Sequence, residues 1–494
     1  MKMNRNSISV IFALIIILSI GISVGSSSES TVISYSIDLS DTAIVMNVPY
    51  VWQELNGFCH WAAYSMILQS AGVPLDLYGV FAASGIGFSS SYLRLDTNMM
   101  LLPGVFFPQM VSTFAVEEIY DVNVTMYLDG TTVTNAEIVA SNLESRGIEF
   151  TKVTGFDEAL EILKDTIDSG YPIEVWTDPY YLPPWDYDIL RDLGIQYDSS
   201  GSAGHAIVAV GYNETAGIVH ILDPGVGAFG DVAYPDDGRY YYDLNMTQLD
   251  HAWRPLFYGC ITAKPGEGLP ADSDTRLTDH ILGRMRGERS YLFSMEDAFF
   301  WVLGSNAFRG LSYDLTATGL SSYLEEFGTL TLSQKAQVIQ GLGFFIEGSL
   351  ALQHLSFLGA VQALPEMLPE FDLDEFVTAC SVAIPHFEAI SDDASLINIA
   401  YAGGASVTTN TFNRIAYDCQ FTYGGDVQSA VTDSEEDLDT LRNHLLAIAD
   451  AWDVAADALD RAVNGDVTAL ILGIVGTASF VSVVSVIVYR RRRV

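Results

Sequence analysis

Residues 52–68, "WQELNGFCHWAAYSMIL", predict a helix that opens on a cysteine. Asn56 is a good N-cap, and Gly72 and Pro74 would stop the helix after "CHWAAYSMILQS". Cys59 then falls in the first turn, where free backbone N–H groups and the helix dipole favour an anionic thiolate. The alternative is a small apolar residue buried at the start of a helix. The choice between them depends on what the chain can place beside the sulfur.

A base and an acid are found far downstream, in "GHAIVAVGYNETAGIVHILDPG". Two strand-like runs joined by the turn-forming "NETAG" predict an antiparallel hairpin. If the hairpin is symmetric about Glu214, His205 lies opposite Asp223, because both are nine residues away. Opposed residues point to the same face with Cβ atoms about 5 Å apart, so the carboxylate could hold the imidazole in one tautomer. A nucleophilic thiol needs such a base and such an orienting group.

Gln53, six residues before the cysteine, is the fourth candidate. Its side-chain amide and the backbone N–H of Cys59 could together stabilise a developing oxyanion. No spacing of Cys and His residues suggests a zinc site, and we expect no cofactor.

These motifs together resemble the papain-like cysteine peptidases, and the C39-like domains are the nearest branch. The resemblance covers about residues 45–262 and implies an α+β papain-like domain. It also implies a role for each candidate: Cys59 the nucleophile, His205 the general base, Asp223 its orienting acid and Gln53 the oxyanion donor. The chain departs from the pattern at one point, since His60 follows the cysteine where C39-like domains often carry a small residue.

A second resemblance rests on "AGVPLDLYGVFAASGIGFSSSYL" and "GYPIEVWTDPYYLPPW". Both are similar to the N-terminal domain of butirosin biosynthesis protein H, a domain of the same fold class that transfers acyl groups. We expect Asp178, Tyr180, Tyr181 and Trp185 to line a substrate cleft, with packing as the alternative role for the rings. A thioester can pass its acyl group to water or to an amine, so hydrolase and acyltransferase both stay open. A papain fold reused as a non-catalytic surface binding module is the third hypothesis.

The two ends of the chain predict membrane targeting. Residues 1–25 carry Lys2 and Arg5 ahead of an apolar run, as in a signal peptide or an anchor. Residues 467–489 contain no charge and are long enough to cross a bilayer. Arginines follow at once in the short tail 490–494, which predicts that this tail is cytoplasmic. We therefore expect a single-pass protein of the cell membrane with most of the chain extracellular.

The composition changes after the papain-like part, residues 31–265. Residues 266–287 are rich in Gly, Pro and Asp and predict a linker. Residues 288–465 predict an α-helical bundle domain, which a C-terminal transmembrane helix follows. Within it, apolar residues at steps of three and four over 438–462 form a seam that packs either in the bundle or against a separate partner.

Charge and cysteine content limit the partners. The chain has 23 Lys and Arg against 62 Asp and Glu; six of the basic residues lie in the two end segments, which leaves 17 against 62, or −45. Such a field repels nucleic acid, so we expect no nucleic-acid partner. A peptide or amide substrate is what the resemblance to cysteine peptidases implies. Three sequons, at Asn123, Asn213 and Asn245, suit an exported glycoprotein. Of the other cysteines, Cys380 and Cys419 could pair, and Cys260 lies in an apolar strand-like run.

Overall fold

The computed structural model describes residues 42–465, apart from position 46 and the segments 96–97, 106–108, 130–149, 197–203, 229–232, 288–299, 326–329 and 393–405. The predicted signal peptide or anchor, the predicted transmembrane helix 467–489 and the tail 490–494 lie outside the described residues. Within the described part, one helix, α13 (Leu332–Met367), is long and apolar enough to cross a membrane. In its most apolar stretch 78% of the residues are buried inside the structure, so α13 packs as a core helix.

The N-terminal half is built on an eight-stranded sheet, in the order β5-β4-β10-β6-β7-β8-β9 with β1 paired to β7. Adjacent strands are antiparallel except β4 and β5, which are parallel. The strands are β1 (Thr42–Ile44), β4 (Val122–Asp129), β5 (Thr151–Val153), β6 (Ile173–Thr177), β7 (His205–Asn213), β8 (Ile218–Leu222), β9 (Tyr241–Asn245) and β10 (Cys260–Pro265). This is the α+β architecture that the sequence predicts.

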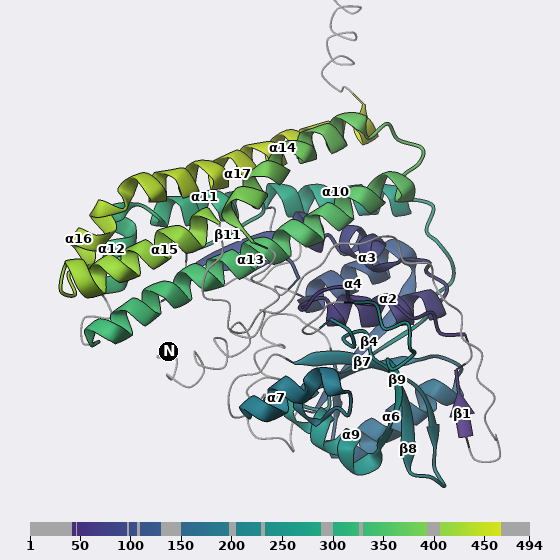
Figure 1. Cartoon of the computed structure of the whole chain (residues 1–494). Helices are drawn as coiled ribbons and strands as arrows, with labels where there is room; N and C mark the ends of the chain where they lie inside the picture. Colours follow the sequence, from purple (N-terminus) through teal and green to yellow (C-terminus); the bar gives the residue numbers. More distant parts are fainter. Residues whose placement is uncertain are drawn as a thin grey trace, which may run out of the picture.

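Helices cover both faces of this sheet (Figure 1). On one face lie α2 (Cys59–Ser70), α3 (Leu77–Ala83) and α4 (Gln109–Tyr120); on the other lie α6 (Gly155–Asp168), α7 (Asp188–Leu193) and α9 (Met246–Trp253). Strand β7 is central, and its alternate residues enter two separate cores, Ala206 and Val208 in one and Ile207 and Ala209 in the other. A strand that is buried on both sides reads as a continuous apolar run, which explains "AIVAV".

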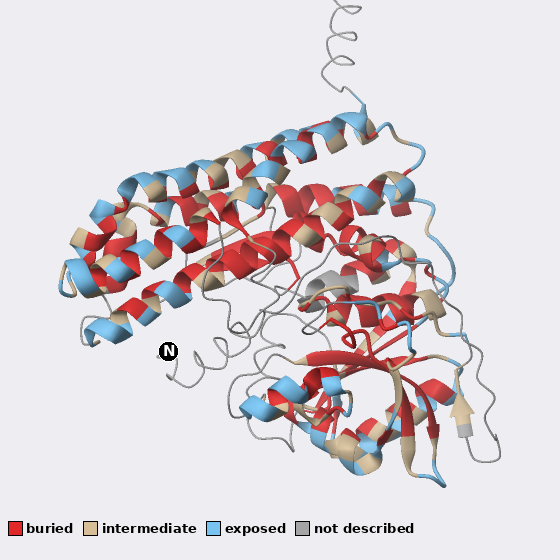
Figure 2. Ribbon diagram, viewed as in Figure 1, coloured by how far each residue is buried: buried red, intermediate tan, exposed pale blue. Residues whose placement is uncertain are grey.

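The C-terminal half packs directly on the α2–α4 face (Figure 1). Its helices are α10 (Ser273–Arg286), α11 (Ser305–Asp314), α12 (Ala317–Glu325), α13, α14 (Asp374–Ile390), α15 (Val407–Tyr417), α16 (Val427–Asp433) and α17 (Glu435–Asn464). A capping box of Thr331 and Gln334 starts α13. Figure 2 shows that the buried residues of α13 lie along its middle and C-terminal parts, and the helix contacts α3 of the N-terminal half as well as α14 and α15.

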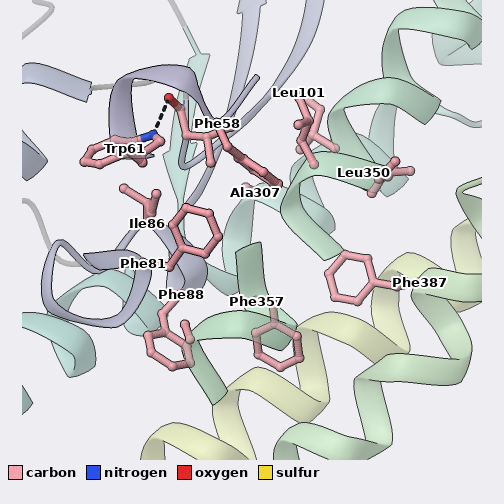
Figure 3. Close-up of a cluster of buried hydrophobic side chains, with 14 of the residues drawn as sticks. Phe58, Trp61, Phe81, Ile86, Phe88, Leu101, Ala307, Leu350, Phe357 and Phe387 are labelled. Atoms are coloured by element: carbon pink, nitrogen blue, oxygen red, sulfur yellow. Dashed lines mark hydrogen bonds between the residues drawn. The ribbon is translucent and has the colours of Figure 1, made fainter. Parts of the chain in front are cut away.

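The two halves share one hydrophobic core. Strand β11 (Phe300–Leu303) pairs with β2 (Ser90–Leu95), which pairs in turn with β3 (Asn98–Pro103). In Figure 3, Phe81 and Phe88 of the first half lie near Phe357 and Phe387 of the second, and the rings of Phe88 and Phe357 are 6.1 Å apart. The prediction of a linker at 266–287 is wrong for residues 273–286, because they form α10. The buried Leu277, Ile281 and Met285 fix this helix in the shared core.

The apolar seam over 438–462 lies on α17 and faces α14, α11 and α10. Its leucines and Trp452 are buried, so the bundle interpretation is confirmed and the seam is used within the chain. The pairing of Cys380 with Cys419, which the sequence left open, is not formed: both are free thiols buried in this core. Cys260, in the apolar run, is also free and buried.

Candidate active site

Cys59 is the first residue of α2 and is partly exposed. The N-cap is Phe58, without a side-chain cap, so the prediction of Asn56 as the N-cap is wrong. The cause is Gly57, whose positive φ of 100° keeps the chain out of the helix until the cysteine. The start of a helix leaves backbone N–H groups without intrahelical acceptors, so the sulfur still lies at the positive end of the dipole.

His205 opens β7, and Asp223 directly follows β8. Nε2 of His205 lies 2.7 Å from Oδ1 of Asp223, and both side chains are buried. The same imidazole forms a hydrogen bond with the Cys59 side chain. Since Asp223 engages Nε2, Nδ1 is the ring nitrogen left for the sulfur. The structure therefore brings the predicted thiol, imidazole and carboxylate together.

The predicted register of the hairpin is nevertheless wrong. Val208 pairs with Leu222, and this register continued to the strand ends sets His205 opposite Gly225 rather than Asp223. An offset of two residues keeps two side chains on the same face of the sheet. The contact survives for that reason.

A β-bulge between Ala209 and Gly211 produces this offset. Nearer the turn, Gly211 pairs with His220. If that register ran to the end of the strands without the bulge, the residue opposite His205 would be three positions away from Asp223. An odd offset would point the two side chains to opposite faces. The extra residue in β7 thus aims the imidazole at the carboxylate, a use of bulges that is common near functional sites.

Four donors surround the Asp223 carboxylate. The N–H of Gly225 donates to Oδ1 (2.8 Å), the hydroxyl of Tyr242 donates to Oδ2 (2.8 Å), and the hydroxyl of Tyr187 reaches both oxygens (3.1 and 3.0 Å). His205 is the fourth donor. A carboxylate held this way can keep the imidazole in one orientation. Reasoning from the sequence missed both tyrosines, because only the fold brings them to Asp223.

Electrostatics favour a charged imidazole. Burial alone would lower the pKa of His205, but the negative charge of Asp223, its hydrogen bond and the nearby Cys59 outweigh burial and raise the pKa to about 10. At neutral pH the imidazole is then a cation beside the sulfur. A neighbouring cation favours the thiolate, which is the nucleophilic form of cysteine.

Residues 50–53 are tied to the loop that carries Asp223. Three hydrogen bonds join them: Tyr50 Oη to the Asp223 carbonyl (3.0 Å), Trp52 Nε1 to the Val226 carbonyl (3.0 Å) and the Gln53 backbone N–H to the Pro224 carbonyl (3.1 Å). Gln53 is buried at the base of this loop, ahead of α2. The predicted oxyanion donor therefore lies on a segment that the acid's own loop holds in place.

The four predicted cleft residues differ in their surroundings. Asp178 is fully buried and caps the 3₁₀ turn η2 (Pro179–Tyr181) by accepting from the Tyr180 N–H. The rings of Tyr180 and Tyr181 pack against each other, which matches the alternative role. Trp185 is 61% exposed, with the Arg239 guanidinium 4.4 Å from its ring. It lies two residues before Tyr187 and is the candidate for substrate contact.

His60 is paired with a different carboxylate. Its Nδ1 lies 2.6 Å from Oε1 of Glu174, a fully buried carboxylate on β6 that also accepts from Trp176 Nε1. The pair anchors α2 to the strand next to β7, and this explains the departure from a small residue. Among the residues that the structure describes, no three His, Cys, Asp or Glu side chains form a cluster that could hold a metal ion.

A partly exposed cysteine at a helix N terminus, bonded to a strand histidine that a buried aspartate holds, is the arrangement of papain-like thiol enzymes. Residues 45–260 match the model of a family described as the Peptidase_C39 like family. The resemblance to C39-like, papain-like peptidases is therefore confirmed for this segment. No curated protein matches the chain. The similarity to butirosin biosynthesis protein H stays a prediction.

Proposed function

We propose that the chain is a thiol hydrolase that cleaves peptide or amide bonds through an acyl-enzyme on Cys59. One observation carries the proposal: the His205 imidazole is hydrogen-bonded to the Cys59 side chain, and its Nε2 is hydrogen-bonded to the buried Asp223. The match of residues 45–260 to a peptidase family supports it.

The thiolate of Cys59 attacks the substrate carbonyl carbon, so that an S–C bond forms and the carbonyl electrons move to oxygen. The His205 imidazolium then gives its Nδ1 proton to the leaving amine as the C–N bond breaks. Water attacks the resulting thioester while His205 takes a proton from it. The acid leaves, and the thiolate and imidazolium are restored. Asp223 keeps the ring oriented throughout.

The oxyanion would bind between the backbone N–H of Cys59 and the side-chain amide of Gln53. Nε2 of Gln53 donates to the Leu55 carbonyl at 3.1 Å and reaches Asn56 Oδ1 only at 3.4 Å. The second contact is long for an N–H···O bond, so that N–H is the one able to turn to a substrate oxygen. Trp185, which is exposed and lies two residues before Tyr187, would contact the substrate.

The location of the enzyme belongs to the same proposal. The uncharged residues 467–489 with the arginines after them support a single membrane span, and the apolar residues 1–25 support export. The catalytic half would then face the outside of the cell, where glycans on the three sequons are expected.

The test uses the full chain in detergent and p-nitrophenyl acetate, an acyl donor that makes no demand on specificity. We expect a burst of one p-nitrophenolate per chain and an acetyl group on Cys59 by mass spectrometry, both lost in Cys59→Ala and His205→Ala. A thioester that reacts with glycinamide faster than with water would replace hydrolysis by acyl transfer. The absence of any burst in wild-type protein would favour the non-catalytic binding module.

A further inference from the structure

A strained turn separates Gln53 from Cys59. The Leu55 N–H donates to the Gln53 carbonyl at 2.6 Å, and Glu54 between them has a φ of 62°. A hydrogen bond between residues two apart, around a positive φ, defines the rarer and strained form of the γ-turn. Such a conformation at a residue other than glycine persists only when its surroundings hold it, and it is commonest at functional sites.

The turn sets the position of the Gln53 side chain. Its amide donates back to the carbonyl of Leu55, on the far side of the turn, at 3.1 Å. Backbone and side chain of Gln53 are therefore both tied to Leu55. If the backbone at Glu54 relaxed to a negative φ, the amide would move with it.

The side chain of Glu54 is held from outside the turn. The hydroxyl of Tyr78, on α3, donates to Oε2 of Glu54 at 2.9 Å. Burial raises the pKa of Tyr78, and the charge of Glu54 raises it further, so the phenol remains a donor at any physiological pH. This hydrogen bond links the turn to the helix that packs beside α2.

The ring of Tyr78 rests on the C-terminal half. It lies against Gly359 of α13, where an added Cβ would be 2.7 Å from Tyr78 Cδ1 and 3.1 Å from Cγ. Figure 1 shows α13 passing over α3. Contacts therefore run without a break from α13 through Tyr78 and Glu54 to the amide of Gln53.

We propose that Tyr78 is a positioning residue for the oxyanion site, and that helix α13 fixes it. The C-terminal half then has a catalytic task, since it supports the turn that aims the Gln53 amide. This inference rests on the proposed function, because it assigns a cause to the placement of the Gln53 donor.

Two reactions of the same sulfur separate positioning from general damage. Iodoacetamide alkylates Cys59 by displacing iodide, with no carbonyl oxyanion, whereas p-nitrophenyl acetate acylates it through one. We expect Tyr78→Phe to acylate about tenfold more slowly, the cost of about one hydrogen bond to a charged group, while alkylation stays within about twofold. Glu54→Gln keeps an acceptor for Tyr78 but removes its charge, so its acylation should fall less than that of Tyr78→Phe, again with alkylation within about twofold.

Gly359→Ala should act like Tyr78→Phe, because the new methyl group pushes the ring off α13. Gly341→Ala is the matched control on the same helix, since an added Cβ there meets nothing within 4 Å. Acylation at the wild-type rate in Tyr78→Phe and Gly359→Ala would overturn the inference, and so would an equal fall of both reactions. Wild-type protein with neither acylation nor His205-dependent alkylation would instead overturn the proposed function itself.

Discussion

Gly225 offers the sharpest test of the site's geometry. It lies opposite His205 in the hairpin, and a Cβ there would be 2.6 Å from His205 Cε1 and 2.7 Å from the Tyr187 hydroxyl. Its φ is not positive, so Gly225→Ala adds a steric conflict without adding backbone strain. We predict that the variant folds and loses most of its reactivity at Cys59.

The expected loss follows from the contact distance. Comfortable contact between carbon atoms needs about 3.5 Å, so the imidazole must retreat by about 0.9 Å from its 2.6 Å position. Misplacement of a catalytic group by about 1 Å can cost about 100-fold in rate. We therefore expect acylation of Cys59 by p-nitrophenyl acetate to fall by about 100-fold.

Gly204→Ala is the local control, because the Cβ there would meet only the end of the flexible Leu256 side chain. It should stay within a few-fold of wild type. Thermal unfolding of both variants, followed by circular dichroism, shows whether the fold is intact. A Gly225→Ala protein that acylates as fast as wild type would refute the assigned positions of His205 and its base role.

Three further outcomes can be measured on purified protein. Tyr242→Phe removes a donor from the buried Asp223 carboxylate and should lower the free energy of unfolding in urea by about 1.5–3 kcal/mol. The pKa of His205 is raised to about 10 in the folded protein, against about 6.5 in the unfolded chain. The charged imidazole therefore stabilises the fold fully below about pH 6.5, and this stabilisation is lost as the pH rises through about 10. The melting temperature should fall over that range, and by less in Asp223→Asn, where the main cause of the raised pKa is gone. His60→Ala should lower the free energy of unfolding by about 3–5 kcal/mol, because it leaves the buried carboxylate of Glu174 without its partner at 2.6 Å. Adding Glu174→Gln to the same chain should restore part of this stability. Equal stability of His60→Ala and wild type would contradict the anchoring role.

The three candidate residues that the structure brings together could be picked out from the sequence because local patterns mark them. A helix bounded by Gly57 and Gly72 and opening on Cys59 is visible in the letters, and so are two apolar runs around a short turn. The nearness of His205 to Asp223 also follows from the hairpin. The pairing itself could not be predicted, since one bulged residue changes the face that each side chain takes.

The rest of the site depends on contacts between distant segments. Tyr187 and Tyr242 reach Asp223 from separate elements, and no spacing in the sequence marks either as a donor. The linker prediction failed for a related reason. Gly, Pro and Asp at the start of 266–287 indicate a break in structure, but Leu277 and Ile281 are buried only because the C-terminal half folds back onto α4 and η1 (Ile86–Phe88).

The central claim is that His205, as a cation held by Asp223, keeps Cys59 in its reactive form. The most direct measurement is the rate of Cys59 labelling by iodoacetamide at about pH 7, read by mass spectrometry beside the buried Cys260, Cys380 and Cys419. The thiolate is the form that reacts, and a neighbouring cation favours it. We predict that Cys59 is labelled ahead of the other three cysteines, and that His205→Ala slows its labelling by about tenfold. Labelling of Cys59 at the same rate in wild type and in the variant would contradict the account.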